Sequence, residues 1–309
     1  MIYISQGHEK GIGLEVFLKS SSMLSQKHLN RMTLVANKKT LEENFRFLNF
    51  NIKVEKNYIS FCNKKLKVIY ISDSCITQSF GALEHISKII RKNDLLITLP
   101  TSKDQLNGFK GHTDYFRSLY NPYASMNFLA YDDNYLLISD HIPLSSVPKI
   151  TSKEIVENLG STLNSIYFKN SKIEEIYFSG INPHCGESGI LGNEDIEVTK
   201  AKDIASKMFP QIKFLGPFSG DTLHTYKNDK NQLFVYMFHD QGLAPFKIKN
   251  GTIGINATFG LPFLRFSPDH GTAFNIYGKN IANYMGMSYL LNQSLRVEEI
   301  YDNKWNKCF

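Results

Sequence analysis

Apolar residues occur along the chain in short continuous runs, separated by longer segments in which apolar residues recur at helical spacing. Most of the short runs lack period-two alternation, which is typical of strands buried on both faces of a parallel sheet. The runs that we interpret as strands are MIYIS (1–5), MTLVA (32–36), LKVIYIS (66–72), DLLITLP (94–100), NYLLISD (134–140), IEEIYFS (173–179) and QLFVYMFHD (232–240).

Amphipathic segments lie between these runs and predict helices. Residues 151–169 begin with Thr151 and Glu154, which have the spacing of a capping box. Residues 83–92 and 197–209 carry apolar side chains at helical intervals. Strands that alternate with helices predict an α/β fold with right-handed crossovers. The 309 residues suffice for one large α/β unit or for two lobes that share a cleft, and no Pro-, Gly- or Ser-rich linker divides them.

Composition excludes several classes of protein. The chain is 42% hydrophobic and 21% charged, which is ordinary for a folded globular protein. Its formal net charge of +6 comes from scattered lysines rather than from a basic cluster interleaved with aromatic residues, so no nucleic-acid partner is expected. No apolar run reaches the length of a membrane span, and the first residues do not resemble a signal peptide. We therefore expect a cytoplasmic protein that does not bind membranes.

The four cysteines are far apart and form no CxxC motif, so neither a disulfide framework nor a structural zinc knuckle is expected.

Histidines follow three of the predicted strands. His141, His184 and His239 each come at or just after the end of such a run. In open α/β sheets, ligands bind at the carboxyl ends of the strands. Three neutral imidazoles suit zinc and similar divalent cations and leave coordination positions open for a substrate. Any one of these histidines alone is more simply explained by a structural role, but the three together make a metal site an equally good interpretation.

Groups that bind anions follow His239 at regular intervals. Lys247, Asn256 and Arg265 are nine residues apart and offer an ammonium, an amide and a guanidinium. Such groups hold carboxylate and phosphate oxygens. Arg265 lies within the apolar segment GLPFLRF, where an unpaired charge would be costly, so we interpret it as a ligand for an anion rather than as surface charge. Asp240, next to His239, is a candidate to orient that imidazole.

No GxGxxG motif follows a predicted strand. The segment GHEKGIG (7–13) resembles that phosphate-binding fingerprint only loosely. A nicotinamide cofactor, if one binds, is therefore not held by the ordinary dinucleotide turn.

Taken together, these segments resemble the 4-hydroxythreonine-4-phosphate dehydrogenases of vitamin B6 synthesis. The likeness extends over nearly the whole chain, and the order and spacing of the shared blocks agree. These blocks are GHEKGIGLE (7–15), LPTSKDQLNGFKGHTDYF (99–116), NYLLISDHIPL (134–144), GINPHCGESGILGNEDI (180–196), GPFSGDTLH (216–224), MFHDQGLAPFK (237–247) and NATFGLPFLRFSPDHGTA (256–273).

The resemblance implies a fold similar to that of the isocitrate and isopropylmalate dehydrogenases. It is a two-lobed α/β/α fold with the active site in the interlobe cleft at a dimer interface. By analogy, residues 1–122 with 262–309 form the cofactor-binding lobe, and residues 123–261 form the dimerisation and metal-binding lobe. The wider group carries an adenosine-binding loop, which HGTAFNIYGKNIAN (270–283) matches. The cofactor residues implied by this match are His270, Gly271, Thr272, Ala273, Asn275 and Asn283.

The resemblance also implies roles for individual side chains. His141, His184 and His239 match ligands of one divalent metal per subunit (Zn, Mg or Co), contributed from both subunits of a homodimer. Lys103 matches a lysine near the site and, with Asp240, is a candidate catalytic residue. The residues that match substrate contacts are His112, Thr113, Lys247, Asn256 and Arg265.

The implied reaction is the NAD- or NADP-dependent oxidation and decarboxylation of 4-phosphooxy-L-threonine to 3-amino-2-oxopropyl phosphate and CO2. Lys103 and a water on the metal are both candidates to take the proton of the C3 hydroxyl. The same chemistry on threonate or erythronate 4-phosphate is an alternative, because such relatives share the metal and phosphate residues. A metal-dependent hydrolase or phosphatase is an alternative of another class, against which the adenosine-type loop argues.

The first block departs from the family pattern G-[DE]-P-A-G-I-G-P-E. His8, Glu9 and Lys10 replace the acid, the proline and the alanine, while the glycines remain. We expect the turn to form and favour no functional role for His8.

Overall fold

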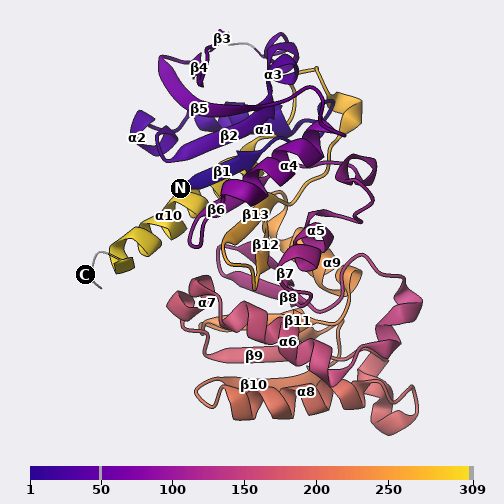
Figure 1. Cartoon of the computed structure of the whole chain (residues 1–309). Coiled ribbons are helices and arrows are strands. Elements are labelled where there is room, and N and C mark those ends of the chain that lie inside the picture. Colours follow the sequence, from indigo (N-terminus) through magenta and orange to yellow (C-terminus); the bar gives the residue numbers. More distant parts are fainter. Residues whose placement is uncertain (49–50, 306–309) are drawn as a thin grey trace. The chain divides into compact units, whose positions relative to one another are not determined.

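The computed structural model describes residues 1–48 and 51–305. The chain divides into two compact units, and each is a mixed α/β body (Figure 1). Unit 1 comprises residues 1–115 and 262–309, and unit 2 comprises residues 116–261.

The sheet of unit 1 is parallel in its centre and antiparallel at one edge. Strand β1 lies between β2 and β6 and pairs with both in parallel. On the outer side, β2 pairs in parallel with β5, and β6 pairs in parallel with β13. Strand β4 pairs with β5, and β3 pairs with β4, both in antiparallel fashion. The order is β13 (Leu264–Pro268), β6 (Leu95–Thr98), β1 (Ile2–Ser5), β2 (Met32–Asn37), β5 (Lys64–Ile71), β4 (Tyr58–Phe61) and β3 (Ile52–Val54).

Helices of unit 1 follow or connect these strands. They are α1 (Gly13–Ser22), α2 (Gln26–Leu29), α3 (Lys38–Phe45), α4 (Gln78–Ile89), the start of α5 (His112–Leu119), α10 (Met285–Trp305) and the short 3-10 turns η1 (Lys103–Leu106) and η5 (Phe274–Ile276).

The sheet of unit 2 has four parallel strands followed by an antiparallel pair. Strands β10, β9, β11 and β8 are parallel neighbours, and β7 and β12 continue the sheet in antiparallel fashion. The order is β10 (Lys213–Phe218), β9 (Glu175–Ser179), β11 (Gln232–Tyr236), β8 (Asp133–Leu137), β7 (Ser125–Ala130) and β12 (Ile255–Phe259).

Helices also cover the sheet of unit 2. Helix α8 packs against β10, α6 against β7, and α9 against β8 and β11. The helical elements are η2 (Leu144–Lys149), α6 (Ser152–Leu163), α7 (Ile166–Ser171), η3 (Pro183–Gly189), α8 (Asp195–Met208), η4 (Leu223–Tyr226) and α9 (His239–Asn250).

Each of the seven runs predicted to be strands contains a strand. The capping box is confirmed, because the Thr151 hydroxyl accepts from the Glu154 N–H and the Glu154 carboxylate accepts from the Thr151 N–H. The single helix predicted for residues 151–169 is wrong in one respect, since it is divided into α6 and α7. The break occurs because the hydroxyl of Ser165 accepts from the N–H of Phe168 and so starts a new helix.

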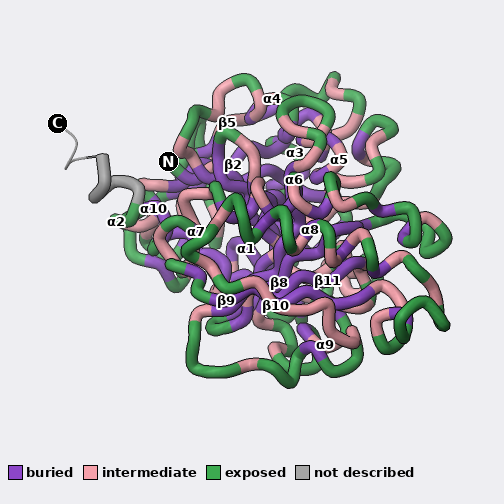
Figure 2. Tube along the Cα trace, turned by 90° about the horizontal axis from the view of Figure 1, so that it is seen from below, coloured by how far each residue is buried: buried purple, intermediate pink, exposed green. Residues whose placement is uncertain are grey.

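Buried residues follow the strands, as the purple segments of the trace in Figure 2 show. In unit 2, aromatic residues from several strands and from α9 form much of the core. The rings of Tyr135 and Tyr236 are 5.1 Å apart between centroids, and Phe246 of α9 lies 5.4 Å from Tyr135. Such aromatic pairs add to the stability that apolar burial alone provides.

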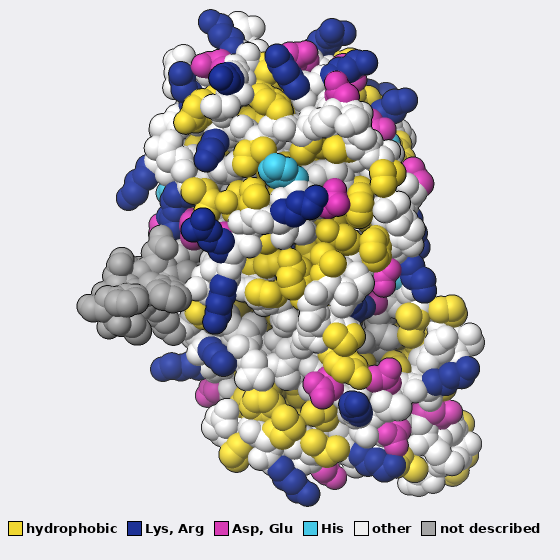
Figure 3. All heavy atoms as spheres, viewed as in Figure 1, with side chains coloured by type: hydrophobic (Ala, Val, Ile, Leu, Met, Phe, Trp, Pro, Cys, Tyr) yellow, Lys and Arg dark blue, Asp and Glu magenta, His cyan; other side chains and the backbone are white. Residues whose placement is uncertain are grey.

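The surface agrees with the scattered charge of the sequence. On the face seen in Figure 3, Lys and Arg side chains are dispersed among uncharged and apolar ones rather than joined in one basic patch. Within the described part of the chain, no helix is both long and apolar enough to cross a bilayer. Cys62, Cys75 and Cys185 are free thiols, and Cys308 lies outside the described residues.

Candidate active site

The three predicted metal ligands follow three neighbouring strands of unit 2. His141 comes after β8, His184 after β9 and His239 after β11, and β11 lies between the other two strands. These strands are parallel, so their carboxyl ends lie at the same edge of the sheet (Figure 1). The sequence predicted histidines at strand ends, and the topology adds that the three strands are adjacent.

His141 and His239 lie close together. Their ring centroids are 5.6 Å apart. The Nδ1 atom of His239 is 2.7 Å from a carboxylate oxygen of Asp240. An imidazole whose Nδ1–H is held by a carboxylate presents Nε2 as the metal ligand in a fixed orientation. The contact is the one expected if Asp240 orients His239.

His184 lies on a separate loop, within η3. It lines a cavity of about 1060 Å³ together with Asp221, His224, Phe238 and Gln241. Among the side chains of the described residues, no three from His, Cys, Asp and Glu surround one point that could hold a metal. One chain therefore brings together His141 and His239 but does not add His184 to them.

The loop of His184 has an unusual backbone. Residues 184–188 all have positive φ angles, with φ 50° and ψ 29° at His184 itself. For residues other than glycine, the left-handed conformation costs about 1–2 kcal/mol each. The sequence predicted that glycines would let this segment bend, but only Gly186 within the run is a glycine. Such strain persists only where surrounding contacts fix the backbone.

Two polar side chains for which the sequence pattern predicts no role join the strand ends. Ser139 donates its hydroxyl to the carbonyl of Met237 at 2.7 Å and so joins the chain beyond β8 to the chain beyond β11. The amide oxygen of Gln241 accepts from the Met237 N–H at 2.9 Å and from the Ser179 hydroxyl at 2.8 Å. The amide nitrogen of Gln241 donates to the carbonyl of Gly180 at 2.8 Å. The only signal in the sequence is that both residues lie within two positions of a histidine.

Unit 1 contains a buried guanidinium. Arg265, on β13, is 3% exposed, and its Nε and Nη2 atoms donate to the hydroxyl of Thr98 at 3.0 and 2.6 Å. Burial lowers the pKa of Arg265 to about 9, so the guanidinium is still charged at neutral pH. This placement agrees with the prediction that Arg265 is not surface charge.

His112 and Thr113 form the first turn of α5. Burial, and then the positive charge of Arg265, lower the pKa of His112 to about 3. Thr113 is buried. A neutral imidazole beside a cation can exchange hydrogen bonds with an anionic substrate without adding charge. Because the charge of Arg265 acts on the imidazole of His112, the two side chains are neighbours, although they are far apart in the sequence.

The other predicted substrate and catalytic residues lie in different settings. Asn256, on β12, has a buried amide oxygen with no hydrogen-bond partner among the described atoms. A bound ligand with an N–H or O–H group could donate a hydrogen bond to this oxygen. Lys247 is on α9 and is exposed. Lys103, the candidate base, is at the start of η1 and is also exposed.

The predicted adenosine loop folds against the N-terminal turn. The carbonyl of Thr272 accepts from the Ile12 N–H at 3.0 Å, and Ala273 adopts a left-handed conformation at φ 47°. His270 uses Nδ1 against the carbonyl of Gly271 at 3.0 Å, while its Nε2 is buried without a partner among the described atoms. A buried nitrogen of this kind is available to a bound cofactor.

The remaining predicted cofactor positions are more exposed. Asn275 lies in η5, and Asn283 uses its side-chain oxygen to accept from the N–H of Met285 at the start of α10.

The glycine turn at the N-terminus forms as expected. A Cβ atom on Gly7 would lie 2.2 Å from the carbonyl oxygen of Pro100, so only glycine fits there. His8 accepts from the Lys10 N–H at 3.0 Å through Nδ1, and its ring packs against that of Phe274 in a T-shaped arrangement with 4.7 Å between the centroids. His8 thus links the N-terminal turn to η5, a structural contact that the sequence did not indicate.

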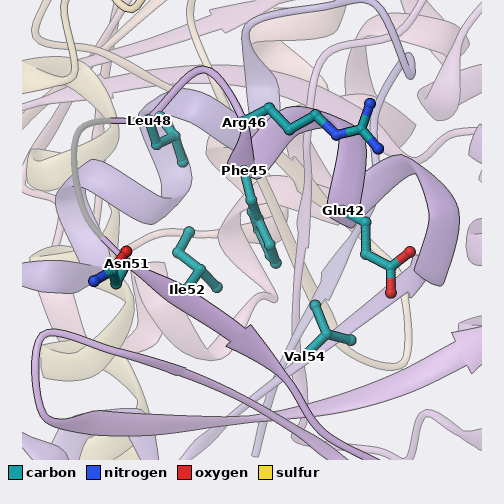
Figure 4. Close-up of a pocket in the computed structure, with 7 residues that line it drawn as sticks. All are labelled: Glu42, Phe45, Arg46, Leu48, Asn51, Ile52 and Val54. Atoms are coloured by element: carbon teal, nitrogen blue, oxygen red, sulfur yellow. The ribbon is translucent and has the colours of Figure 1, made fainter.

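Two other cavities in the described part of the chain contain none of the predicted site residues. One of about 480 Å³ lies in unit 1 between α3 and β3, and Figure 4 shows Phe45, Ile52 and Val54 pointing toward one another there. Another, of about 920 Å³, lies in unit 2 beside Glu175 and Lys230.

The fold is similar to that of isocitrate dehydrogenase and of the 4-hydroxythreonine-4-phosphate dehydrogenases. Isocitrate dehydrogenase from Methylococcus capsulatus superposes with a TM-score of 0.51 at 12% identity, over 96% of this chain and 84% of that one. The crystal structure of 4-hydroxythreonine-4-phosphate dehydrogenase from Klebsiella pneumoniae is more similar, with a TM-score of 0.73 at 23% identity, over 96% of this chain and 99% of that one. The two-lobed α/β architecture predicted from the sequence is confirmed.

Sequence similarity identifies the family. The model of the pyridoxal phosphate biosynthetic protein PdxA matches residues 28–292. The 4-hydroxythreonine-4-phosphate dehydrogenase of Sulfurihydrogenibium sp. (strain YO3AOP1) is 32% identical, over 91% of this chain and 92% of that protein. That of Aquifex aeolicus (strain VF5) is 31% identical, over 97% and 98%. The chain belongs to the PdxA family.

Proposed function

We propose that the chain oxidises the C3 hydroxyl of 4-phosphooxy-L-threonine with NAD or NADP as the hydride acceptor. The resulting β-keto acid loses CO2 and leaves 3-amino-2-oxopropyl phosphate. The observation that carries this proposal is that His141, His184 and His239 follow three adjacent parallel strands in a chain that belongs to the PdxA family.

The residues present fit a divalent cation. His141 and His239 are close enough to share one ion, and Asp240 leaves Nε2 of His239 as the metal-binding nitrogen. A bound cation of this kind would supply a Lewis acid for the oxygen at C3. Because His184 does not join the other two within one chain, we propose that the set of three is completed across a homodimer.

The anionic ends of the substrate require fixed donors. In this proposal Arg265 and Lys247 bind phosphate or carboxylate oxygens, and the buried oxygen of Asn256 accepts a hydrogen bond from the substrate. Neutral His112 and the hydroxyl of Thr113 add hydrogen bonds at the start of α5. Holding both ends of the substrate fixes the position of the C3 hydrogen for transfer.

The cofactor is proposed to bind unit 1 at the loop of residues 270–283. The support is the unpartnered Nε2 of His270 and the left-handed turn at Ala273. A base must also take the proton of the C3 hydroxyl. Lys103 or a water molecule would perform this step. Unit 1 is then the cofactor-binding unit, and unit 2 carries the metal ligands and the dimer contacts.

A direct absorbance assay tests the proposal. Purified protein is mixed with NAD or NADP, a divalent cation and one of three compounds, namely 4-phosphooxy-L-threonine, threonate 4-phosphate or erythronate 4-phosphate. We expect NADH or NADPH formation with the amino acid phosphate, loss of turnover with a chelator, and recovery when the metal is restored. Turnover with only the hydroxy acid phosphates would show that one of them, and not the amino acid phosphate, is the substrate. Turnover that a chelator does not affect would contradict the proposed role of the metal.

A further inference from the structure

A buried carboxylate holds the loop that carries His184. Asp195, in the first turn of α8, is 6% exposed. Its Oδ1 accepts from the Ile181 N–H at 2.6 Å, and its Oδ2 accepts from the backbone N–H and the side-chain amide of Asn182, both at 3.1 Å. Charge-assisted bonds of this kind are stronger than neutral ones, and the helix N-terminus further favours the negative charge.

The loop closes tightly around this carboxylate. The Asn182 carbonyl accepts from the Cys185 N–H at 3.1 Å, so the residue that Asp195 anchors also starts the turn of positive φ angles. A Cβ atom on Gly180 would lie 2.6 Å from Oδ1 of Asp195 and 2.9 Å from Sγ of Cys185. The carboxylate therefore fills the space that the glycine leaves.

Gly186 provides a second fixed point. A Cβ atom there would lie 2.4 Å from the carbonyl oxygen of Gly192, and the Gly186 carbonyl accepts from the Leu191 N–H at 3.0 Å. The strained residues between Asn182 and Gly186 include His184. Their conformation is set by Asp195 at one end and by this contact at the other, as strained backbone requires.

We propose that Asp195 is a positioning residue for His184: it acts through the loop backbone to aim the imidazole at the cation, without touching the metal or the substrate. This inference rests on the proposed function, in which His184 is a metal ligand. Without the carboxylate, the three N–H groups that it binds and the strained residues of the loop lose their common anchor, and the imidazole samples other positions.

The test measures metal affinity of the full-length protein by calorimetric titration with Co²⁺. Asp195→Asn keeps the size of the side chain but offers only one acceptor atom to three N–H groups. The matched control is Glu197→Gln, because Glu197 is also in the first turn of α8 and accepts a backbone N–H at 2.8 Å, but from Ser152 and not from the loop. We expect Asp195→Asn to weaken binding by about tenfold or more and Glu197→Gln to leave it unchanged.

A double-mutant comparison shows whether Asp195 acts through His184. In a protein that already carries His184→Ala, Asp195→Asn should cause no further loss of Co²⁺ affinity. An additional loss there, or wild-type affinity in Asp195→Asn, would overturn the inference while leaving the metal site itself intact. A wild-type protein that binds no Co²⁺ would instead overturn the proposed function.

Gly180→Ala is a second test in case Asp195→Asn does not fold. It keeps the carboxylate but places a methyl group against Asp195 and Cys185. We expect weaker Co²⁺ binding here as well. If Asp195→Asn is unfolded by circular dichroism and folded Gly180→Ala binds Co²⁺ as the wild type does, the inference is wrong.

Discussion

His112 allows a quantitative test of the neighbourhood of Arg265. Burial and the adjacent guanidinium lower the pKa of His112 from 6.5 to about 3. The unfolded chain therefore binds a proton at this side chain below about pH 6.5, while the folded protein does not until the pH is much lower. His112 therefore does not reduce the free energy of unfolding above about pH 6.5, and it reduces this free energy progressively as the pH falls below that value. Replacing His112 with Gln, which does not titrate, removes this dependence.

The magnitude follows from the shift. A pH of about 5 is roughly 1.5 units below the ordinary histidine pKa, so protonation of His112 stabilises the unfolded chain by about 2 kcal/mol at that pH. Other groups titrate in the same range, but they do so equally in the wild type and in His112→Gln. The difference between the two proteins therefore isolates His112. Arg265→Met should reduce this difference without abolishing it, because burial is the larger cause of the shift.

Urea unfolding followed by circular dichroism measures the free energy of unfolding at about pH 8 and about pH 5, at one protein concentration. We expect the wild type to lose about 2 kcal/mol more than His112→Gln between the two values. Equal losses in the two proteins would contradict this prediction, because His112 would then titrate normally in the folded state.

Three further predictions concern binding. Arg265→Lys should raise KM for the phosphorylated substrate about tenfold in steady-state kinetics, because an ammonium cannot reproduce the donor geometry of the guanidinium. Exposed Arg91→Lys is the control and should leave KM unchanged. An unchanged KM in Arg265→Lys would mean that Arg265 does not bind the substrate. His270→Ala should weaken NAD binding in a fluorescence titration while Co²⁺ affinity stays constant, and equal NAD affinity would remove its buried Nε2 from the cofactor site. Asp240→Asn should lower Co²⁺ affinity about 10- to 100-fold, whereas an unchanged affinity would mean that its contact with His239 does not serve the metal.

Much of the fold was predictable because the buried strands are continuous apolar runs. Strand β10, which the sequence did not predict, departs from that pattern because it is only half-buried and contains Gly216 and Pro217. Strand β7 was not predicted although it is buried along its length, because Ser125 and Asn127 interrupt its apolar residues. The division between α6 and α7 depends on one side-chain contact of Ser165, which amphipathic spacing does not reveal.

The candidate site was predictable in its residue types but not in its arrangement. Histidines after strands indicate a metal, yet only the order β9, β11, β8 makes the three strands neighbours. The supporting side chains were missed because their partners are distant in sequence. Gln241 is 61 residues from Gly180, and Asp195 is 14 residues from Ile181, so neither contact follows from a local pattern.

Diffraction from crystals grown with Co²⁺ and measured at the cobalt absorption edge would show whether His141, His184 and His239 share one cation, as we propose. We expect an anomalous peak about 2.0–2.1 Å from an imidazole nitrogen of each of the three histidines, with both subunits of a dimer contributing. A peak bound by other side chains, or three histidines that approach no common point in any pairing of subunits, would contradict it.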